Sequence, residues 1–414
     1  MFTSFSTALS GLKANTTAID VMGNNLANLN TTGFKTSDVT FEDLMSESLS
    51  NGPGAAQIGF GVSTPSTLLN FSQGAIQSTG GALDAAIQGD GFFVDQSASG
   101  TIGYTRNGTF QVNSNGQLST TTGQLVQGWS ATNGTVNTNA PTGPITVPVG
   151  SLAAAQATQT TSVDLNLDAS ATTGATNGTF STSVQVYDSL GISHVATFAF
   201  TKTATANQWN YSASIPATDT TAPSTPVTGT LTFDTNGNLT SPAAGAAQPV
   251  IAATGLVDGA AALNITWNLY NGTTPRITQF AQTSATSAVA QNGVPAANLV
   301  SIGIANGGQI FAKYSSGQQT VVGQIAMASI RNPESLIAVG NSNFEVSALT
   351  AAPTIGLPGT GGRGTVVAGS VESSNADIAK EFTDLIVYQR GYEANAKVIT
   401  AVDQLSQATI NLKQ

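Results

Sequence analysis

The sequence predicts a mostly β protein with an α-helix at each end of the chain, and three observations support this. Apolar residues near both ends recur at alternating steps of four and three, which is typical of a helix seam. Between the ends, Asn-Gly pairs flanked by alternating apolar residues indicate β-hairpins. Charged residues make up only 8% of the 414 residues, whereas about 25% is typical of soluble proteins.

The N-terminal helix is predicted to run to about residue 30 and to stop at Thr31-Thr32-Gly33, with Gly33 as the glycine after the helix. At 1.5 Å per residue, such a helix is about 40 Å long. The residues of its heptad seam are Phe5, Leu9, Leu12, Thr16, Ile19, Gly23 and Leu26.

Four asparagines near the end of this helix stand out, because asparagine is a poor helix former. We interpret Asn24, Asn28 and Asn30 as buried amides that fix the register of helix packing, as one buried amide does in a coiled coil. Asn25 and Thr31 are interpreted as residues that end the helix. The alternative is that all four amides are exposed and fray the helix end.

The C-terminal helix is predicted to begin near Ser374 and Asp377, which resemble a capping box, and to exceed about 50 Å. Its seam consists of Ile378, Phe382, Leu385, Gln389, Tyr392, Ala396 and Ile399, followed in a shifted phase by Val402 and Leu405. We predict that the two helices pair as a coiled coil. Small and amide residues in the seams favour close packing against several neighbours; the alternative is one intramolecular coiled coil with an imperfect seam.

Low-complexity stretches rich in Gly, Pro, Ser and Thr mark the predicted domain boundaries. The predicted parts are a terminal helical domain (1–30 and 370–414), extended linkers (31–71 and 356–369), an inner β domain (72–145 and 281–355) and an outer β domain (146–280). Asn-Gly pairs, the main hairpin signal, begin at residues 51, 107, 115, 133, 177, 236, 271, 292 and 306.

Charge and cysteine content exclude several classes of function. A net charge of −10 with only 12 Lys and Arg argues against nucleic-acid binding. The chain has no cysteine, so disulfides and thiol chemistry are excluded. We find no secretory signal and no run of about 18 apolar residues, so we expect no membrane insertion and, if the protein is exported, a route without a cleaved signal peptide.

An enzyme is the main alternative class, and the sequence offers little chemistry for it. The only histidine, His194, lies in a strand-like stretch and is expected on a strand surface. The segment 359–365 (GTGGRGT) lacks the Lys-Ser/Thr of a phosphate loop, and 89–93 (GDGFF) has too few carboxylates for calcium. We therefore predict no catalytic, cofactor-binding or metal-binding residues. A carbohydrate-binding outer β domain is a further alternative.

The terminal motifs resemble those of the bacterial flagellar axial proteins, the family of rod, hook and hook-associated subunits. The resemblance covers "ALSGLKANTTAIDVMGNNLANLNTTGFK" (8–35) and "SSNADIAKEFTDLIVYQRGYEANAKVITAVDQ" (373–404). The segments 79–95, 104–129 and 331–347 resemble the inner β domain of the family. Leu29, Arg331 and Ala376 depart from the commoner residues without disturbing the pattern.

Within this family the inserted domain distinguishes the members. The segments 184–209 and 229–242 resemble the middle domain of hook-type subunits, which distal rod subunits lack. The resemblance implies a structural subunit that polymerises into a short curved tube, the joint that transmits torque from rod to filament. The alternative is a distal rod or hook–filament junction subunit.

The resemblance also implies partners and a location. The expected partners are copies of the chain itself, the distal rod protein, the hook–filament junction protein, the hook cap, the hook-length control protein and the flagellar type III export apparatus. The expected location is the extracellular flagellum, and the expected assembly interface is the apolar and amide residues of the two helices named above.

Overall fold

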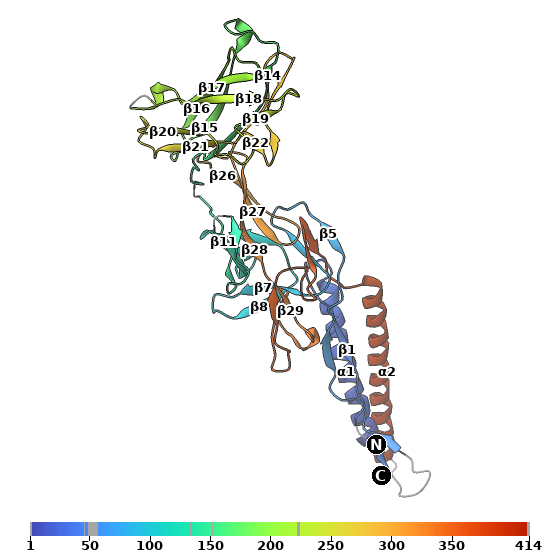
Figure 1. Ribbon diagram of the computed structural model, residues 1–414. Helices are drawn as coiled ribbons and strands as arrows, with labels where there is room; N and C mark the ends of the chain where they lie inside the picture. The colour runs from blue at the N-terminus through green and yellow to red at the C-terminus, as the bar shows by residue number, and fades with distance from the viewer. Residues whose placement is uncertain are drawn as a thin grey trace. The chain divides into compact units, whose positions relative to one another are not determined.

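The computed structural model describes residues 2–44, 46–48, 57–132, 134–150, 152–221 and 224–411. The chain forms two compact units, shown in Figure 1. The terminal unit comprises Met1–Val149, Ser301–Lys313 and Gln319–Gln414, and the central unit comprises Gly150–Val300 and Tyr314–Gln318.

The helices α1 (Phe2–Ala27) and α2 (Ile378–Asn411) lie side by side in the terminal unit, as predicted (Figure 1). The expected end of α1 is partly wrong, because Gly33 lies in a loop beyond the helix rather than directly after it. Gly33 has a φ of 70°, and a Cβ there would lie 2.5 Å from the backbone nitrogen of Asn107. A close approach of two backbones therefore requires this glycine.

The start of α2 also differs from the predicted capping box. The Oδ1 atom of Asp377 accepts hydrogen bonds from the backbone N–H groups of Ala379 at 2.8 Å and Lys380 at 3.3 Å. Asp377 is therefore the N-cap residue itself, and Ser374 lies outside the helix. The carboxylate also lies at the positive end of the helix dipole, which adds to its capping effect.

A large, mainly antiparallel sheet forms the body of the terminal unit. Its central path runs β26-β27-β28-β11-β7-β8-β31-β30, with six short strands paired at its sides. The strands of the path are β26 (Leu299–Ile304), β27 (Gln309–Tyr314), β28 (Gln319–Ile325), β11 (Leu125–Thr132), β7 (Phe92–Gln96), β8 (Ile102–Thr105), β31 (Asn343–Glu345) and β30 (Ile337–Gly340). The side strands are β9 (Phe110–Val112), β10 (Leu118–Thr120), β12 (Thr135–Val136), β13 (Gly143–Pro144), β29 (Met327–Ser329) and β32 (Thr354–Gly356).

Short two-stranded ladders join the helices to this body. Five of the eight strands lie in the segments expected as extended linkers, which are therefore paired over part of their length. The strands at 76–78 and 85–88 lie in the predicted inner β domain, and the strand at 370–372 lies in the predicted terminal helical domain. The ladders are β1 (Ser37–Thr40) with β4 (Ser66–Leu69), β2 (Ser46–Ser48) with β3 (Gln57–Gly59), β5 (Ile76–Ser78) with β34 (Ser370–Glu372), and β6 (Ala85–Gln88) with β33 (Thr365–Ala368).

The central unit is a sandwich of two five-stranded sheets. One sheet is antiparallel: β15 (Thr179–Tyr187), β16 (Ser193–Lys202), β17 (Gln208–Ser214), β18 (Val227–Phe233) and β19 (Leu239–Ser241). The other is mixed: β20 (Val250–Ala253), β21 (Leu263–Trp267), β14 (Thr160–Asp168), β24 (Ile277–Phe280) and β25 (Ala285–Gln291). A small pair, β22 (Tyr270–Asn271) with β23 (Thr274–Pro275), and the 3-10 turns Thr176–Gly178 and Ala217–Asp219 complete the unit; a third such turn, Pro333–Ser335, lies in the terminal unit.

Period-two alternation builds the core of this sandwich. In β16 the side chains of alternate residues from His194 to Lys202 are buried. The indole of Trp267 is fully buried and its ring centroid lies 4.8 Å from that of Phe198 and 5.2 Å from that of Tyr211. Aromatic rings from both sheets therefore fill the space between them.

The predicted boundaries of the outer β domain differ from those of the central unit. The prediction ended that domain at residue 280, but β25 pairs antiparallel with β14 over Thr161–Asn166, so residues up to Val300 belong to the central unit. The local pattern could not reveal this, because the partner strand is more than a hundred residues away. The finer division of the terminal unit stays a prediction.

Four of the Asn-Gly pairs lie between paired strands, with glycine at positive φ, as the hairpin rule predicts. They begin at residues 115, 236, 271 and 306. Those at 107, 177 and 292 do not form such turns, since their glycines lack positive φ. The pair at 51 and Asn133 of the pair at 133 lie outside the described residues.

Candidate assembly interface

Small and amide side chains, rather than the predicted apolar seam, form the contact between α1 and α2. The residues of α1 that are buried, or half-buried on the same face, are Ala8, Gly11, Ala14, Asn15, Ala18, Met22 and Asn25. At 100° per residue, this row is offset by roughly 100° from the predicted seam. The helices therefore pack through a face that the apolar pattern does not mark.

A reciprocal pair of glycine–asparagine contacts sets the closest approach of the helices. A Cβ on Gly11 would lie 2.9 Å from Nδ2 of Asn395, and a Cβ on Gly391 would lie 2.7 Å from Oδ1 of Asn15. Each asparagine donates to the carbonyl of the glycine one turn earlier in its own helix, at 2.7 Å for Asn15 and 2.9 Å for Asn395. The side chains are thus fixed over the opposite glycine, and the helices run antiparallel.

Asn25 is the buried amide of this interface, which corrects its interpretation as a helix terminator. Its side chain is fully buried and donates to Oε2 of Glu381 at 3.2 Å and to the carbonyl of Ser37 at 3.0 Å. Its Oδ1 atom accepts from the N–H of Ser37 at 3.1 Å. Burial raises the pKa of the Glu381 carboxyl, and the amide of Asn25 opposes this shift. One side chain thus joins α1, β1 and α2.

The apolar residues of the predicted seams face outward or lie at the edges of the helical contact. Phe5, Leu9, Ile378, Phe382, Tyr392 and Leu405 are exposed, and Leu12, Ile19, Leu26, Leu385, Ile399 and Val402 are half-buried. The two helices pair as predicted, but half of the large residues of the predicted seams are exposed rather than buried in the contact between them. Large side chains there would hold the helices apart, whereas glycine and alanine let them approach closely. Their role between chains stays a prediction.

Helix α2 carries exposed apolar side chains on two flanks that lie outside its contact with α1. Ile378, Phe382 and Ile386 lie on one flank, and Val387, Val398 and Leu405 lie on the other. The two flanks are separated by roughly 150° around the helix axis at 100° per residue. Ile378, Phe382 and Ile386 follow one another at i,i+4 spacing, and exposed apolar surface that is contiguous in this way marks an interaction site in soluble proteins. The helical pair has unused apolar surface on both sides.

A buried charge cluster, here called the junction clasp, ties the chain after α1 to the strand before α2. It consists of Lys35, Arg106 and Glu372. The carboxylate of Glu372 lies 2.6 Å from Nζ of Lys35 and 3.2 Å from Nη1 of Arg106, and all three side chains are buried. Burial lowers the pKa of the Lys35 ammonium, while Glu372 opposes this effect. Removing one partner of a buried ion pair is costly, so the clasp holds its three segments together firmly.

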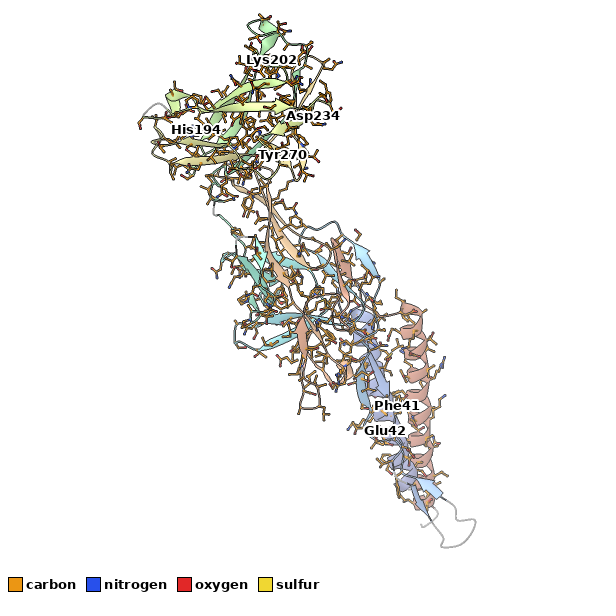
Figure 2. The ribbon with its side chains drawn as sticks, viewed as in Figure 1. Phe41, Glu42, His194, Lys202, Asp234 and Tyr270 are labelled. Carbon is orange, nitrogen blue, oxygen red and sulfur yellow. The ribbon has the colours of Figure 1, made fainter. Side chains whose placement is uncertain are left out.

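Further contacts around the clasp attach α2 to the segments after α1. Asn375 accepts from the N–H of Thr36 at 2.8 Å, and Nζ of Lys380 lies 3.1 Å from Asp38. The ring of Phe41, labelled beside the helices in Figure 2, lies 5.8 Å from the ring of Tyr388. The base of α2 is therefore anchored to β1 and to the residues that follow it.

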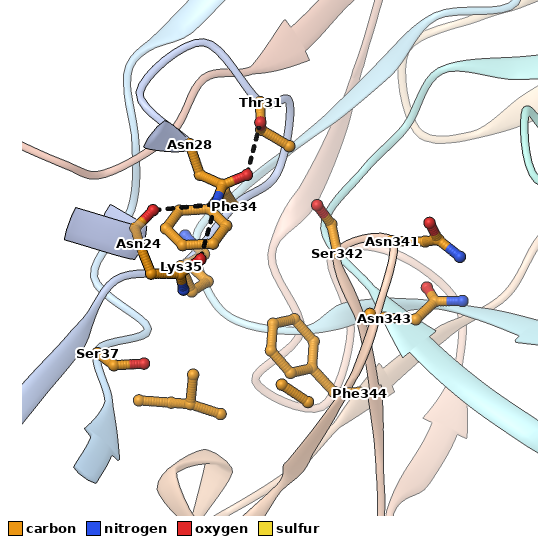
Figure 3. Close-up of a pocket in the computed structure, with 13 residues that line it drawn as sticks. Asn24, Asn28, Thr31, Phe34, Lys35, Ser37, Asn341, Ser342, Asn343 and Phe344 are labelled. Atoms are coloured by element: carbon orange, nitrogen blue, oxygen red, sulfur yellow. Dashed lines mark hydrogen bonds between the residues drawn. The ribbon is translucent and has the colours of Figure 1, made fainter. Parts of the chain in front are cut away.

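Asn24 and Asn28 lie at the end of α1 and line a cavity, shown in Figure 3. Asn28 donates to the carbonyl of Asn24 at 3.0 Å, and Thr31 donates to Oδ1 of Asn28 at 3.0 Å. The cavity is about 410 Å³ and also contacts the β30–β31 hairpin. Asn24 and Asn30 are exposed and Asn28 is half-buried. Their predicted role in packing against neighbouring subunits stays a prediction.

Sequence reasoning missed the Gly-x-x-x-Asn pairs and the junction clasp. The same five-residue spacing occurs at Gly11–Asn15 and Gly391–Asn395, and this repetition in both helices was the available signal. Charged residues are rare in this chain, and the available signal for the clasp was that Lys35, Arg106 and Glu372 are among the few. Neither signal shows which residues meet, because the clasp joins residues hundreds of positions apart.

Four family models match about two thirds of the chain, in the order of its structural parts. A flagella basal body rod protein model matches residues 5–35, and a flagellar basal body rod FlgEFG protein C-terminal model matches 367–412. Between them, a flagellar hook protein FlgE/F/G D1 domain matches 86–169, and a flagellar basal body protein FlaE D2 domain matches 166–294. The helical pair, the β body and the central sandwich thus define an axial protein of the bacterial flagellum.

Relatives over the full length identify the family more closely. The chain is 34% identical to the flagellar hook protein FlgE of Salmonella typhimurium (strain LT2), covering 99% of this chain and all of the relative. It is 33% identical to that of Borreliella burgdorferi over the whole of both chains. The crystal structure of Helicobacter pylori flagellar hook protein FlgE2 shares the fold, with a TM-score of 0.52 and 13% identity over 72% of this chain and 99% of that one. The chain belongs to the flagellar hook protein family.

Membership of this family agrees with the resemblance found in the sequence, and it favours the hook over the distal rod. Among the described residues, none of the helices has both the length and the apolar character needed to cross a membrane.

Proposed function

We propose that this chain is the building block of a flagellar hook, which forms when copies of α1 and α2 pack together into a short curved tube. The tube is a universal joint that transmits torque from the rod to the filament. The observation that supports this most directly is the exposed apolar surface on both flanks of α2 in a chain of the hook protein family.

The two flanks explain how one helical pair can enter a closed tube. A helix that contacts one neighbour needs one apolar stripe, whereas α2 has Gly391 and Asn395 facing α1 and exposed apolar side chains on two other flanks. In the tube, each flank is buried against a helix of a different neighbouring subunit. Phe5 and Leu9 of α1 supply a third apolar contact.

The junction clasp gives the mechanical link within each subunit. Torque carried by the helices must pass into the β body through the segments that contain Lys35 and Glu372. Paired charges in a low-dielectric site resist separation, because breaking the pair leaves an uncompensated buried charge. The clasp therefore makes the helical pair and its β body turn together.

The same proposal sets the location and the partners. The subunit acts outside the cell in the flagellum and is exported by the flagellar type III apparatus without a cleaved signal peptide. It joins the distal rod protein at one end of the tube and the hook–filament junction protein at the other. A hook cap and a length-control protein direct its assembly.

The test places a charge on one flank of α2. Phe382→Asp should prevent the full-length chain from forming tubes on seed fragments, because the carboxylate would be buried against a neighbour. The matched control is Lys397→Asp, which also places a carboxylate on the exposed surface of α2 but has no flank residue three or four positions away. Electron microscopy of negatively stained assemblies reads out the result. Short curved tubes from the Phe382→Asp chain, or straight thin rods from the unmodified chain, would contradict the proposal.

A further inference from the structure

The single histidine of the chain lies in the central unit, among three aspartates (Figure 2). It was expected on a strand surface, but His194 is only 4% exposed, because it occupies an inward-facing position at the start of β16. The correction matters chemically. A buried imidazole surrounded by carboxylates is a group that needs a specific partner.

The three carboxylates come from three separate loops. Asp188 follows β15, Asp219 ends the 3-10 turn after β17, and Asp258 lies between β20 and β21. Oδ2 of Asp188 and Oδ2 of Asp258 lie 3.3 Å and 3.4 Å from Nε2 of His194, and Oδ2 of Asp219 lies 3.0 Å from Nδ1. The ring therefore has two carboxylates on one nitrogen and one on the other.

Each aspartate is held in place by its other oxygen. Oδ1 of Asp188 accepts from the N–H groups of Leu190 and Ile192 at 2.8 Å each. Oδ1 of Asp258 accepts from the N–H of Ala260 at 2.9 Å. Because these bonds lie within each loop, they fix the orientation in which Oδ2 points at the imidazole. The arrangement is thus built in advance of any ligand.

Backbone bonds also link the loops to one another. The N–H of Val257 donates to the carbonyl of Asp219 at 3.1 Å, and the N–H of Ala261 donates to Oγ of Ser189 at 3.0 Å. The loops that carry the three aspartates are therefore cross-connected, so their spacing is fixed by the fold.

We propose that Asp188, His194 and Asp258 form a binding site for a divalent transition-metal ion of the zinc type, with Asp219 as the positioning residue behind the histidine. The three ligand atoms lie within 4.8 Å of one another. Tetrahedral bonds of about 2.0–2.1 Å place ligand atoms about 3.3–3.4 Å apart, which matches the two distances to Nε2. An imidazole ligand favours zinc-like ions over calcium, which takes six to eight oxygens.

Tautomer and charge are both compatible with a bound divalent ion. When Nδ1–H donates to Asp219, the lone pair of Nε2 points toward the two remaining carboxylates, which is the carboxylate–histidine–metal arrangement. Three carboxylates and an imidazolium leave a net charge of −2 at the cluster, whereas three carboxylates, a neutral imidazole and a divalent ion leave −1. The side chains of Asp219 and Asp258 are 29% and 15% exposed, which provides an entry path.

The site has a structural consequence that is independent of polymerisation. A bound ion would join three loops at one end of the sandwich, and its binding energy would add to the folding energy of the central unit. The sequence-based expectation that the chain binds no metal would then be incomplete. The pattern could not have shown the site, because its members are separated by up to seventy positions.

The test is a calorimetric titration of Zn²⁺ into chelator-treated full-length protein without a histidine tag. We expect one ion per chain, binding about 100-fold weaker or lost in His194→Gln and Asp258→Asn, and about 10–100-fold weaker in Asp219→Ala. The matched control, Asp234→Asn, removes an aspartate that accepts bonds only within its own turn in the same unit, and it should bind normally. Circular dichroism checks that each variant is folded.

Two further measurements separate the outcomes. Co²⁺ bound in place of Zn²⁺ should give the intense visible bands of four-coordination, which His194→Gln should lack. Mg²⁺ and Ca²⁺ should not compete. If Zn²⁺ binding survives in both His194→Gln and Asp258→Asn, the ion is bound only by carboxylates on the protein surface. If no saturable binding occurs, the cluster is an imidazolium ion paired with three aspartates. Either result would overturn the proposal.

Discussion

The helical pair and the central sandwich bury opposite kinds of residue. In the sandwich, Trp209, Trp267 and Phe198 are buried between the sheets, and threonine and serine face outward. In the helical pair, Gly11 and Asn25 are buried, while Ile386 and Val387 are more than half exposed. The sandwich closes its own core, whereas the helices leave apolar side chains exposed. The pattern of apolar residues in the sequence therefore identifies the buried residues of the sandwich, but it does not identify the buried residues of the helical pair.

The largest expected effect tests whether the sandwich is self-sufficient. Trp267→Ala removes the ring that contacts Phe198, Tyr211 and Phe200, and it should destabilise the central unit by about 3–5 kcal/mol. Scanning calorimetry should show the loss in one transition while the transition of the terminal unit is unchanged. If both unfolding transitions shifted equally, the central unit would not be stabilised independently of the terminal unit.

The next effect concerns the place where the helices meet the β body. Glu372→Gln leaves Lys35 and Arg106 buried without a counter-charge, and it should lower the free energy of unfolding of the terminal unit by about 3 kcal/mol. Glu393→Gln is the control, because its ion pair with Arg390 is exposed and contributes less than about 1 kcal/mol. Urea unfolding of both variants measures the difference. Equal stabilities would mean that the clasp is not what holds the helices to the body.

A smaller effect concerns a polar exception inside the sheet of the terminal unit. Asp95 is buried, and among the described residues no group lies in hydrogen-bonding geometry to its carboxylate. Burial raises the pKa of Asp95 to about 6, and the nearby amide of Asn343 opposes this shift only in part. The folded state therefore binds this proton more tightly than the unfolded state. The protonated Asp95 therefore contributes to the free energy of unfolding. This contribution is complete below about pH 4 and is lost as the pH rises through about 6.

Asp95→Asn should remove this pH dependence. The free energy of unfolding of the wild type minus that of the variant should fall by about 3 kcal/mol between pH 4 and pH 7, as measured by denaturant unfolding. A difference that stays constant over this range would contradict the assignment. The result would sharpen the contrast with Glu381, whose buried carboxylate accepts a hydrogen bond from Asn25.

The smallest effect compares two helical glycines. Gly23→Ala meets no atom within 4 Å and should stabilise α1 by about 1 kcal/mol, since alanine is the better helix former. Gly391→Ala gains the same propensity but displaces Asn15, so its net effect should be zero or negative. Amide hydrogen exchange across the two helices reads out both. Equal stabilisation would show that the reciprocal glycine–asparagine contact does not limit helix approach.

Local signals predicted the elements well. The seam spacing predicted both helices, and the Asn-Gly pairs at 115 and 236 predicted hairpins, because each depends on a few neighbouring residues. The face of each helix was not predictable in the same way. Large apolar residues at the seam positions satisfy the heptad rule whether the partner is in the same chain or another chain.

Long-range partners account for what the sequence could not show. The strand β25 was assigned to the wrong domain because its partner β14 lies far away in the sequence. His194 was placed on a surface because alternation gives two faces and does not say which one is inward. The charged partners of Glu372 were missed for the same reason. Residues that act together across the fold have no local signature.

The link between Asn25 and Glu381 spans 356 positions of the chain. At a synthesis rate of about 5–20 residues per second, α1 waits roughly 20–70 s on the ribosome before its partner helix exists. An unpaired amphipathic helix of this length is only marginally stable in water. Helix α1 is therefore synthesised first but is among the last elements to contact its final partner. Until then, the unpaired α1 of one nascent chain must be kept from associating with that of another.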